Sequence, residues 1–457
     1  MIQIDFDTRL SIDTIMEILN KYDFERYKSN WSYYLGENQK ILTRRVDEQA
    51  APDNKIAVPY ARKIITTVTG YMYKPGLITY SSDEDKYIET LQGIFDENNE
   101  TIKTSEAGKQ TSIQGVGYEV HYTQKQGSKI MPRFAKLKAS EGIPVYNTDI
   151  EPELTAFLHP YTYGDMEYLD VYYADVIAYY ERRKVDPVYM PVIEEPHIYG
   201  QVPIVVYRNN EEELGDFEHV KSLIDAYDVL MSDSMNEFDR FAWAYLIFKG
   251  YQPPTAEEAK SIKQRKIFGV DADGAVQFLT KDINHAFIMF MAEWIRKEIH
   301  KQTHVPDFLD SGKTGDALSG VAIDKLLYDF EFVAATKEAL FKEGLYNRID
   351  LINRVLGQGR ANFGLTDSAA GLVEITFTRN KPDMSAQNAE TMQKYNGMVS
   401  LETLLGKFAP FVTDVQAELE RLNAEKGSID LGFDSGSGDE AEGGNVDTDL
   451  PNEGDTD

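Results

Sequence analysis

The chain has 457 residues, 42% of them hydrophobic, which is enough for about two to four domains with sizeable buried cores. It has no cysteine, which excludes a disulfide framework, cysteine-ligated zinc and thiol catalysis and fits a protein made in a reducing cytoplasm. Its net charge of −29, from 76 acidic and 47 basic residues, argues against tight, stationary binding to duplex DNA, because such binding needs Lys and Arg to neutralise phosphates.

The first half of the chain changes from a helical pattern to a strand pattern. Apolar residues at helical spacing predict one or two helices over 10–35, and further helices over 56–74, 86–98 and 103–114. From Gly117 the period becomes two, and Pro, Gly and Asn separate the alternating stretches. The β-rich region over 117–208 is predicted to contain strands near 118–122, 143–147, 153–159, 170–180 and 203–207.

A long amphipathic helix is predicted next. Apolar residues recur every three or four positions from Phe217 to Phe248, a length of roughly 48 Å as a helix. Gly250 and the prolines that follow end this pattern. Beyond them, residues 267–270 and 275–279 flank an Asp-Ala-Asp-Gly turn, and we expect them to form a hairpin.

The second half of the chain is predicted to be mainly helical. One helix is expected over 284–302 and a very long one over 318–356, with Gly344 as a kink because glycine weakens a helix interior by about 1 kcal/mol. A strand over 372–378 and two or three short helices over 385–425 follow. The remaining residues are rich in Gly, Ser, Asp and Glu and contain too little apolar surface to fold.

Two motifs are candidates for chemical sites. Ser311-Gly312-Lys313-Thr314 matches the end of a phosphate-binding loop, but Asp307 stands where the full signature needs glycine. His300 and His304 are four residues apart without a third metal ligand, so packed or solvated histidines are the favoured interpretation. No carboxylate pair or nucleophile indicates acid–base or covalent catalysis, and we expect no catalytic residue, no cofactor and no metal.

A basic cluster stands out in this acidic chain. Lys260, Lys263, Arg265 and Lys266 lie close together before the expected hairpin. One interpretation is a solvated helix face, and the other is a contact with an acidic partner or nucleic acid.

Eight short motifs, in this order and spacing, resemble the portal proteins of tailed bacteriophages, of the SPP1-like family. The resemblance spans roughly residues 10–420. The motifs are Asn54–Ile64, Gly115–Glu119, Val202–Val205, Gly215–Glu218, Leu223–Asp228, Leu279–Ile283, Ser319–Ala322 and Phe377–Asn380.

The resemblance implies an α+β, mainly helical portal fold with wing, stem, clip and crown regions. By position, the chain would divide into a wing (1–212), a wing-to-stem helix (213–249), a clip (250–282), a second stem helix (283–305), a tunnel loop (306–318), a long helix (319–357), a strand returning to the wing (358–382), a crown (383–425) and a disordered acidic tail (426–457).

The resemblance also implies a function. Portal proteins form a dodecameric ring at one vertex of the phage head, conduct double-stranded DNA, and dock the terminase motor, the head-completion adaptor and the tail. Capsid and scaffolding proteins are further expected partners, and the protein is expected in the virion and, during assembly, in the host cytoplasm. Ser311, Gly312, Lys313, Thr314 and Gly315 would form a DNA-channel loop, and the basic cluster would dock the motor.

Membrane association is not expected. The N-terminus lacks the basic and apolar segments of a secretory signal, and the apolar runs are far shorter than the ~18 residues that span a bilayer. Two alternative functions remain open from the residues alone. They are a nucleotide-dependent packaging enzyme and a passive capsid or tail component without a DNA channel.

Overall fold

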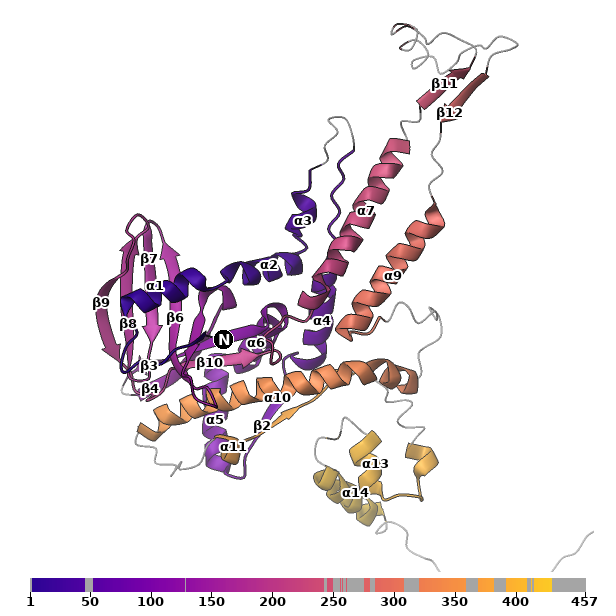
Figure 1. Ribbon diagram of the computed structural model, residues 1–457. Coiled ribbons are helices and arrows are strands. Elements are labelled where there is room, and N and C mark those ends of the chain that lie inside the picture. The colour runs from indigo at the N-terminus through magenta and orange to yellow at the C-terminus, as the bar shows by residue number, and fades with distance from the viewer. Residues whose placement is uncertain are drawn as a thin grey trace, which may run out of the picture. The chain divides into compact units, whose positions relative to one another are not determined.

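The protein is described by a computed structural model (Figure 1). It describes residues 2–45, 52–127, 129–241, 245–249, 275–279, 284–307, 320–358, 369–381, 392–408 and 415–429, with the single positions Thr255, Glu257, Lys260 and Val412. Two compact units are distinguished, Met1–Lys381 and Pro382–Asp457. Across the described part of the chain, no helix combines the length and apolar character needed to span a membrane.

The N-terminal part of the first unit is helical, as predicted. Its helices are α1 (Ile12–Lys21), α2 (Phe24–Leu35), α3 (Gln39–Leu42), α4 (Tyr60–Met72), α5 (Asp85–Asn98) and α6 (Glu100–Gln114). The pattern over 10–35 forms two helices because Asp23 caps the second one. Its carboxylate accepts hydrogen bonds from the backbone N–H groups of Glu25 and Arg26.

Two antiparallel-rich sheets follow, which confirms the β-rich region. A three-stranded sheet has the order β10-β3-β4, and a six-stranded sheet has the order β1-β5-β6-β7-β8-β9. The strands are β1 (Ile2–Gln3), β3 (Val116–Gln126), β4 (Lys129–Leu137), β5 (Ile143–Tyr146), β6 (Leu154–Tyr163), β7 (Met166–Tyr172), β8 (Val176–Arg183), β9 (Met190–Pro196) and β10 (Ile204–Arg208), with short 3₁₀ helices η1 (Ala139–Glu141) and η2 (Glu218–Val220).

The single strand predicted over 170–180 is wrong. The chain turns between β7 and β8, where the N–H of Tyr173 donates to the carbonyl of Val176 over 2.9 Å. From Val171 to Tyr180 the chain is apolar except for Asp175, so the sequence shows no clear break between two strands. Only the pairing of β7 with β8 shows two strands.

The long helix predicted to end near Phe248 is also wrong in its last part. Helix α7 covers Lys221–Phe241, and Tyr245–Lys249 form strand β11. Four consecutive apolar residues, 245–248, fit a helix or a strand equally well. Pairing decides between them, because β11 is antiparallel to β12 (Ala275–Leu279). The strand predicted over 275–279 is therefore present, whereas its predicted partner, 267–270, lies outside the described residues.

The helices predicted over 284–302 and 318–356 are confirmed as α9 (His285–Thr303) and α10 (Gly320–Gln358). Helix α10 runs without interruption through Gly344, and contact rather than kinking explains this glycine. A Cβ there would lie 2.4 Å from a ring carbon of Tyr207 on β10. The short helix α11 (Ala369–Leu372) precedes β13 (Glu374–Phe377), which pairs antiparallel with β2 (Ile78–Ser81).

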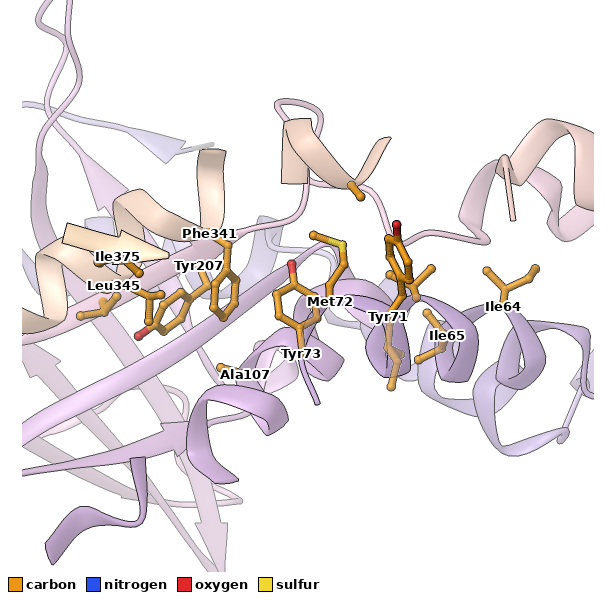
Figure 2. Close-up of a cluster of buried hydrophobic side chains, with 14 of the residues drawn as sticks. Ile64, Ile65, Tyr71, Met72, Tyr73, Ala107, Tyr207, Phe341, Leu345 and Ile375 are labelled. Carbon is orange, nitrogen blue, oxygen red and sulfur yellow. The ribbon is translucent and has the colours of Figure 1, made fainter. Parts of the chain in front are cut away.

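The main core of the first unit joins α4, α6, α10 and β10 (Figure 2). Phe341 of α10 lies between two tyrosine rings, with centroid distances of 4.8 Å to Tyr73 and 4.8 Å to Tyr207. A second core packs α1 against the six-stranded sheet through Ile15 and Ile18. Each core unites residues more than a hundred positions apart, so it holds the first unit together as one body.

The second unit contains α13 (Leu401–Phe408) and α14 (Val415–Ile429). These helices confirm the prediction of short helices after residue 385. The predicted start of the disordered tail at residue 426 is wrong, because α14 continues to Ile429. The helix-forming Ala-Glu-Lys stretch before Gly427 explains why the helix extends further than the change in composition suggests.

Candidate functional site

Helices α7 and α9 pack side by side and lead toward the paired strands β11 and β12 (Figure 1). The start of α9 is capped by Asn284, whose side chain accepts from the N–H of Phe287. The residue after the helix, His304, is its C-cap and adopts a left-handed conformation with φ of 57°. This local geometry gives α9 defined ends beside its partner helix.

The α7–α9 pair exposes an unusual amount of apolar surface. Phe238 on α7 is 65% exposed and Met289 on α9 is 71% exposed. Both helices contribute further large apolar side chains to solvent, namely Val229, Met235, Phe287, Phe290 and Trp294. Soluble proteins rarely leave so many apolar groups together in water without a partner. The pair is therefore suited to packing against other protein surfaces.

One face of α7 is attached to an extended segment that precedes α4. Alternate backbone N–H groups of this segment, at Asn54, Ile56 and Val58, donate to side chains spaced four residues apart on α7. The acceptors are Asn236 at 2.7 Å, Ser232 at 2.9 Å and Asp228 at 2.8 Å. An extended chain exposes its N–H groups every second residue, and a helix brings residues i, i+4 and i+8 to one face.

Asp228 connects this attachment to a second segment of the chain. It is fully buried and also accepts from the amide of Asn38 at 2.8 Å. Burial raises the pKa of Asp228, although the hydrogen bonds from Val58 and Asn38 lower it in part. Two of the family motifs, Asn54–Ile64 and Leu223–Asp228, thus meet here and position α7.

The C-terminal end of α9 is held by a charged cluster around Asp307. This carboxylate accepts from Arg296, and Lys63 of α4 approaches it to 3.5 Å. His300 is buried beside it and its Nδ1 contacts the carbonyl of Val305 at 3.0 Å. Burial lowers the pKa of His300. The residue that breaks the phosphate-binding signature therefore fixes the chain where the predicted channel loop begins.

The two histidines lie in different surroundings. His300 packs in the protein, whereas His304 is exposed at the end of α9. Among the residues that the structure describes, no group of three His, Cys, Asp or Glu side chains could hold a metal ion.

Sequence reasoning missed a buried ionic network on α10. Arg348 is completely buried and makes a two-pronged contact with Glu119 of β3, at 2.9 and 2.7 Å. It also donates to Glu100 of α6 at 2.9 Å. Burial by itself raises the pKa of Glu119, but Arg348 and His121 lower it by more, to about 2. The carboxylate is therefore charged in the folded protein.

A second buried ion pair lies eleven residues earlier on α10. Lys337 donates to both carboxylate oxygens of Asp216, at 2.6 and 2.7 Å, and to Ser112 at 3.1 Å. Burial lowers the pKa of Lys337, and Asp216 opposes this shift. The one sequence signal for both pairs is that Lys337 and Arg348 stand at positions where the apolar spacing of α10 calls for a hydrophobic residue.

Glycines of two family motifs allow the end of α6 to pack tightly against residues 213–215. Gly115 ends α6 with φ of 85°, and a Cβ on it would lie 1.8 Å from the carbonyl oxygen of Glu213. Gly215 also lies too close for a side chain, since a Cβ on it would lie 2.4 Å from the carbonyl oxygen of Ile113. Only glycine fits such contacts. The motifs Gly115–Glu119 and Gly215–Glu218 therefore bring Asp216 and Glu119 to α10.

Most residues predicted to meet DNA or partners lie outside the described residues. This holds for the loop residues Ser311, Gly312, Lys313, Thr314 and Gly315, and for Lys263, Arg265 and Lys266 of the basic cluster. Lys260 is described, and it is helical and exposed.

Comparison with known proteins identifies the family. The model of the family described as "Phage portal protein, SPP1 Gp6-like" matches residues 19–430. The portal protein of Bacillus phage SPP1 is 24% identical over 443 residues, covering 90% of this chain and 86% of the relative. The portal protein of Clostridium phage phiCD119 is 23% identical over 428 residues, covering 87% and 92% respectively.

The solved structures found by comparison come from gene transfer agent (GTA) particles. The neck of an empty particle, computed with C6 symmetry, gives a TM-score of 0.47 at 11% identity and covers 77% of this chain and 90% of that one. The virion of a native particle gives 0.46 at 10% identity, covering 85% and 93%. Because the family match extends from α1 to the end of the described residues, the chain belongs to the SPP1 Gp6-like family of phage portal proteins.

Proposed function

We propose that this portal protein assembles into a dodecameric ring that conducts double-stranded DNA through the vertex of a phage head. The observation that carries the proposal is the apolar surface exposed on both helices of the α7–α9 pair. A helix pair that repeats around a ring buries such surface against its neighbours, and a head-to-tail contact that closes on itself satisfies every copy equally.

The dimensions of packed helices are compatible with a DNA channel. Helices pack about 8–10 Å apart, so twelve in a circle have an axis-to-axis diameter of about 36 Å. Subtracting one helix diameter of about 10 Å leaves a lumen of about 26 Å, which is wide enough for a duplex. One helix of the pair per subunit would line this stem.

The net charge of −29 fits a conduit. Carboxylates facing a channel repel phosphates, whereas fixed rings of Lys or Arg would bind DNA and hold it in place. The segment between α9 and α10 would supply the contact with DNA, with Lys313 as its cation, and Asp307 would fix where this segment leaves α9.

In this proposal the wing, stem, clip and crown follow the boundaries expected from the resemblance, with two changes. Strand β11 (Tyr245–Lys249) joins the clip through its pairing with β12, and the crown extends to Ile429. The clip would dock the terminase motor during packaging and the head-completion adaptor afterwards. Its basic cluster, which includes the exposed Lys260, suits an acidic docking surface. Scaffolding and major capsid proteins would surround the wing, and the assembled protein would reside in the virion.

Electron microscopy of the purified full-length chain tests the ring directly. We expect rings with a central hole, and sheets or monomers would instead favour a passive structural component. The channel is tested by Lys313→Glu, which should leave rings intact and lower the rate of DNA packaging. The matched control is Lys301→Glu on the exposed side of α9, which should leave packaging unchanged. A packaging enzyme would instead show ATP hydrolysis by the purified chain.

A further inference from the structure

A basic pocket lies where α2 and α6 meet the end of β4. Its cavity of about 510 Å³ is lined by Tyr27, Trp31, the four lysines Lys28, Lys109, Lys136 and Lys138, and one carboxylate, Glu106, which pairs with Lys136. Trp31 is 42% exposed although it belongs to a helix that packs into the main core. An aromatic wall with a cationic rim suits an apolar anchor flanked by carboxylates.

The lysines of this pocket are available to a second partner. Three of them contact exposed carboxylates of the same chain, since Lys28 pairs with Glu25 at 2.6 Å, and Lys136 and Lys138 make similar surface pairs. Surface pairs of this kind contribute only about 0–1 kcal/mol, so rearranging them costs little. Lys109 lies over the ring of Tyr34, with its Nζ 4.9 Å from the ring centroid.

The matching feature is an acidic loop, residues 147–153, between β5 and β6. Its central residue, Ile150, has a relative exposure of 102%, and Asp149, Glu151 and Glu153 around it are also exposed. Isoleucine is among the residues most often buried in proteins, so its complete exposure between three carboxylates calls for an explanation.

Hydrogen bonds hold this loop in one shape. The N–H of Asn147 donates to the carbonyl of Glu153 at 3.0 Å, and the N–H of Glu153 donates to the side chain of Asn147 at 2.8 Å. The N–H of Thr148 donates to Asp5 at 3.0 Å, and the pKa of Asp5 is lowered by its contacts with Thr148. A loop already ordered in its binding shape loses little conformational entropy on association.

The loop and the pocket lie at opposite edges of the three-stranded sheet. That sheet has the order β10-β3-β4. The loop borders a cavity that is also lined by Ile204 and Val206 of β10, whereas Lys136 of β4 lines the basic pocket. A head-to-tail contact needs two different patches on different sides of one subunit.

We infer that the acidic loop of one subunit inserts Ile150 into the basic pocket of the next subunit in the ring. This inference rests on the proposed ring and assigns it a specific wing contact. Ile150 contacts the Trp31 wall, and the carboxylates around it meet the lysines at the rim. Every copy then has its loop and its pocket occupied once.

Cross-linking tests this contact in the full-length protein. The chain contains no cysteine, so introduced thiols are unique. We expect the double variant Ile150→Cys, Ser140→Cys, treated with a short bis-maleimide, to give a ladder of covalent multimers. A mixture of the two single variants should stop at dimers. Val185→Cys with Ser140→Cys is the control and should give no ladder, because the turn after β8 lies at the far end of the six-stranded sheet from the loop.

Assembly measurements provide the second readout. Ile150→Asp should raise the protein concentration needed for half-maximal assembly about tenfold or more, with no change in the melting temperature of the subunit. Lys109→Glu should also weaken assembly, and adding Glu151→Lys to it should restore part of the loss, because only residues in contact compensate in this way.

The outcomes separate this inference from the proposed function. Rings without a ladder, and unaffected by Ile150→Asp, would overturn the loop contact and leave the ring proposal intact. Failure of the unmodified chain to form rings would overturn the proposed function, and this inference with it. If deletion of residues 430–457 weakens assembly while Ile150→Asp does not, the pocket holds the acidic C-terminal segment and the inference is wrong.

Discussion

Helix α10 and the α7–α9 pair have similar amphipathic patterns but differ in which side chains they bury. Helix α10 buries Arg348 and Lys337, and each finds a carboxylate within the same chain. The α7–α9 pair instead leaves Phe238 and Met289 in solvent. From Lys337 onward, the described part of α10 exposes no large apolar side chain, and Arg348 and Lys337 are paired within the chain. The helix pair, like Tyr328 and Phe332 nearer the start of α10, instead presents apolar side chains that a single subunit leaves uncovered.

The largest expected effect is the loss of stability when the buried ionic network of α10 is broken. Arg348→Met should lower the free energy of unfolding by about 3–5 kcal/mol, because Glu119 and Glu100 would remain buried without their counterion. Chemical denaturation followed by circular dichroism measures this loss. Arg354→Met is the matched control, since Arg354 is exposed and donates to the carbonyl of Tyr199, and it should cost about 1 kcal/mol or less. Equal losses in both variants would contradict the role of the network.

The same network predicts how stability depends on pH. The folded pKa of Glu119 is about 2, below its ordinary 4.5. The ion pair therefore stabilises the protein fully above about pH 4.5, and this contribution is lost as the pH falls toward 2. The difference in pKa corresponds to about 3 kcal/mol. Unfolding free energies of the unmodified chain and of Glu119→Gln between pH 6 and pH 2 measure it. The acid-dependent loss should be smaller in the variant.

A medium loss of stability is expected where the extended segment before α4 attaches to α7. Asp228→Ala removes the acceptor for the N–H of Val58 and the amide of Asn38, and should cost about 1–3 kcal/mol. Hydrogen exchange should become faster at Val58 in particular. The control is Asp233→Ala, which removes a partly exposed pair with Arg44 and should cost at most about 1 kcal/mol. Slow exchange at Val58 in the Asp228 variant would show that the attachment does not depend on this carboxylate.

The smallest effect on the single subunit is expected from the exposed helix pair. Phe290→Ser should change the free energy of unfolding by no more than about 0.5 kcal/mol, because this side chain is already in solvent. Ring formation, measured by sedimentation, should nevertheless weaken. Tyr163→Ser removes an even more exposed aromatic ring from the six-stranded sheet, 80% exposed against 61% for Phe290, and serves as the control. If both variants assemble equally well, the apolar face of α9 is not an assembly surface.

Regular helices were predictable because their signal is local. The bounds of α9 and α10 lie within two residues of those predicted, whereas α4 begins at Tyr60, four residues after its predicted start, because the segment before it is extended along α7. Strand β11 was missed because residues 245–248 are consecutively apolar and fit two periods. Its partner β12 begins at Ala275, so pairing between distant residues decided the outcome. The turn at Tyr173 was missed for a related reason, since the residues around it are almost all apolar and show no break.

The candidate site was only partly predictable. The sequence indicated the helices of the proposed stem and the motifs that carry the family resemblance. It did not indicate that Asp228 receives the backbone of another segment, or that Asp307 pairs with Arg296. The loop residue Lys313 and most of the basic cluster stay predictions, since they lie outside the described residues.

The sequence by itself determined the family, the succession of helices and strands in most of the chain, the acidic balance and the absence of cysteine. Only the tertiary structure decided which charges are buried and which apolar groups remain outside. Arg348 and Glu119 are 229 residues apart, and no local pattern records that they meet. The physical reason is that burial depends on contacts between distant segments, whereas spacing along the chain reports only the face on which a residue lies.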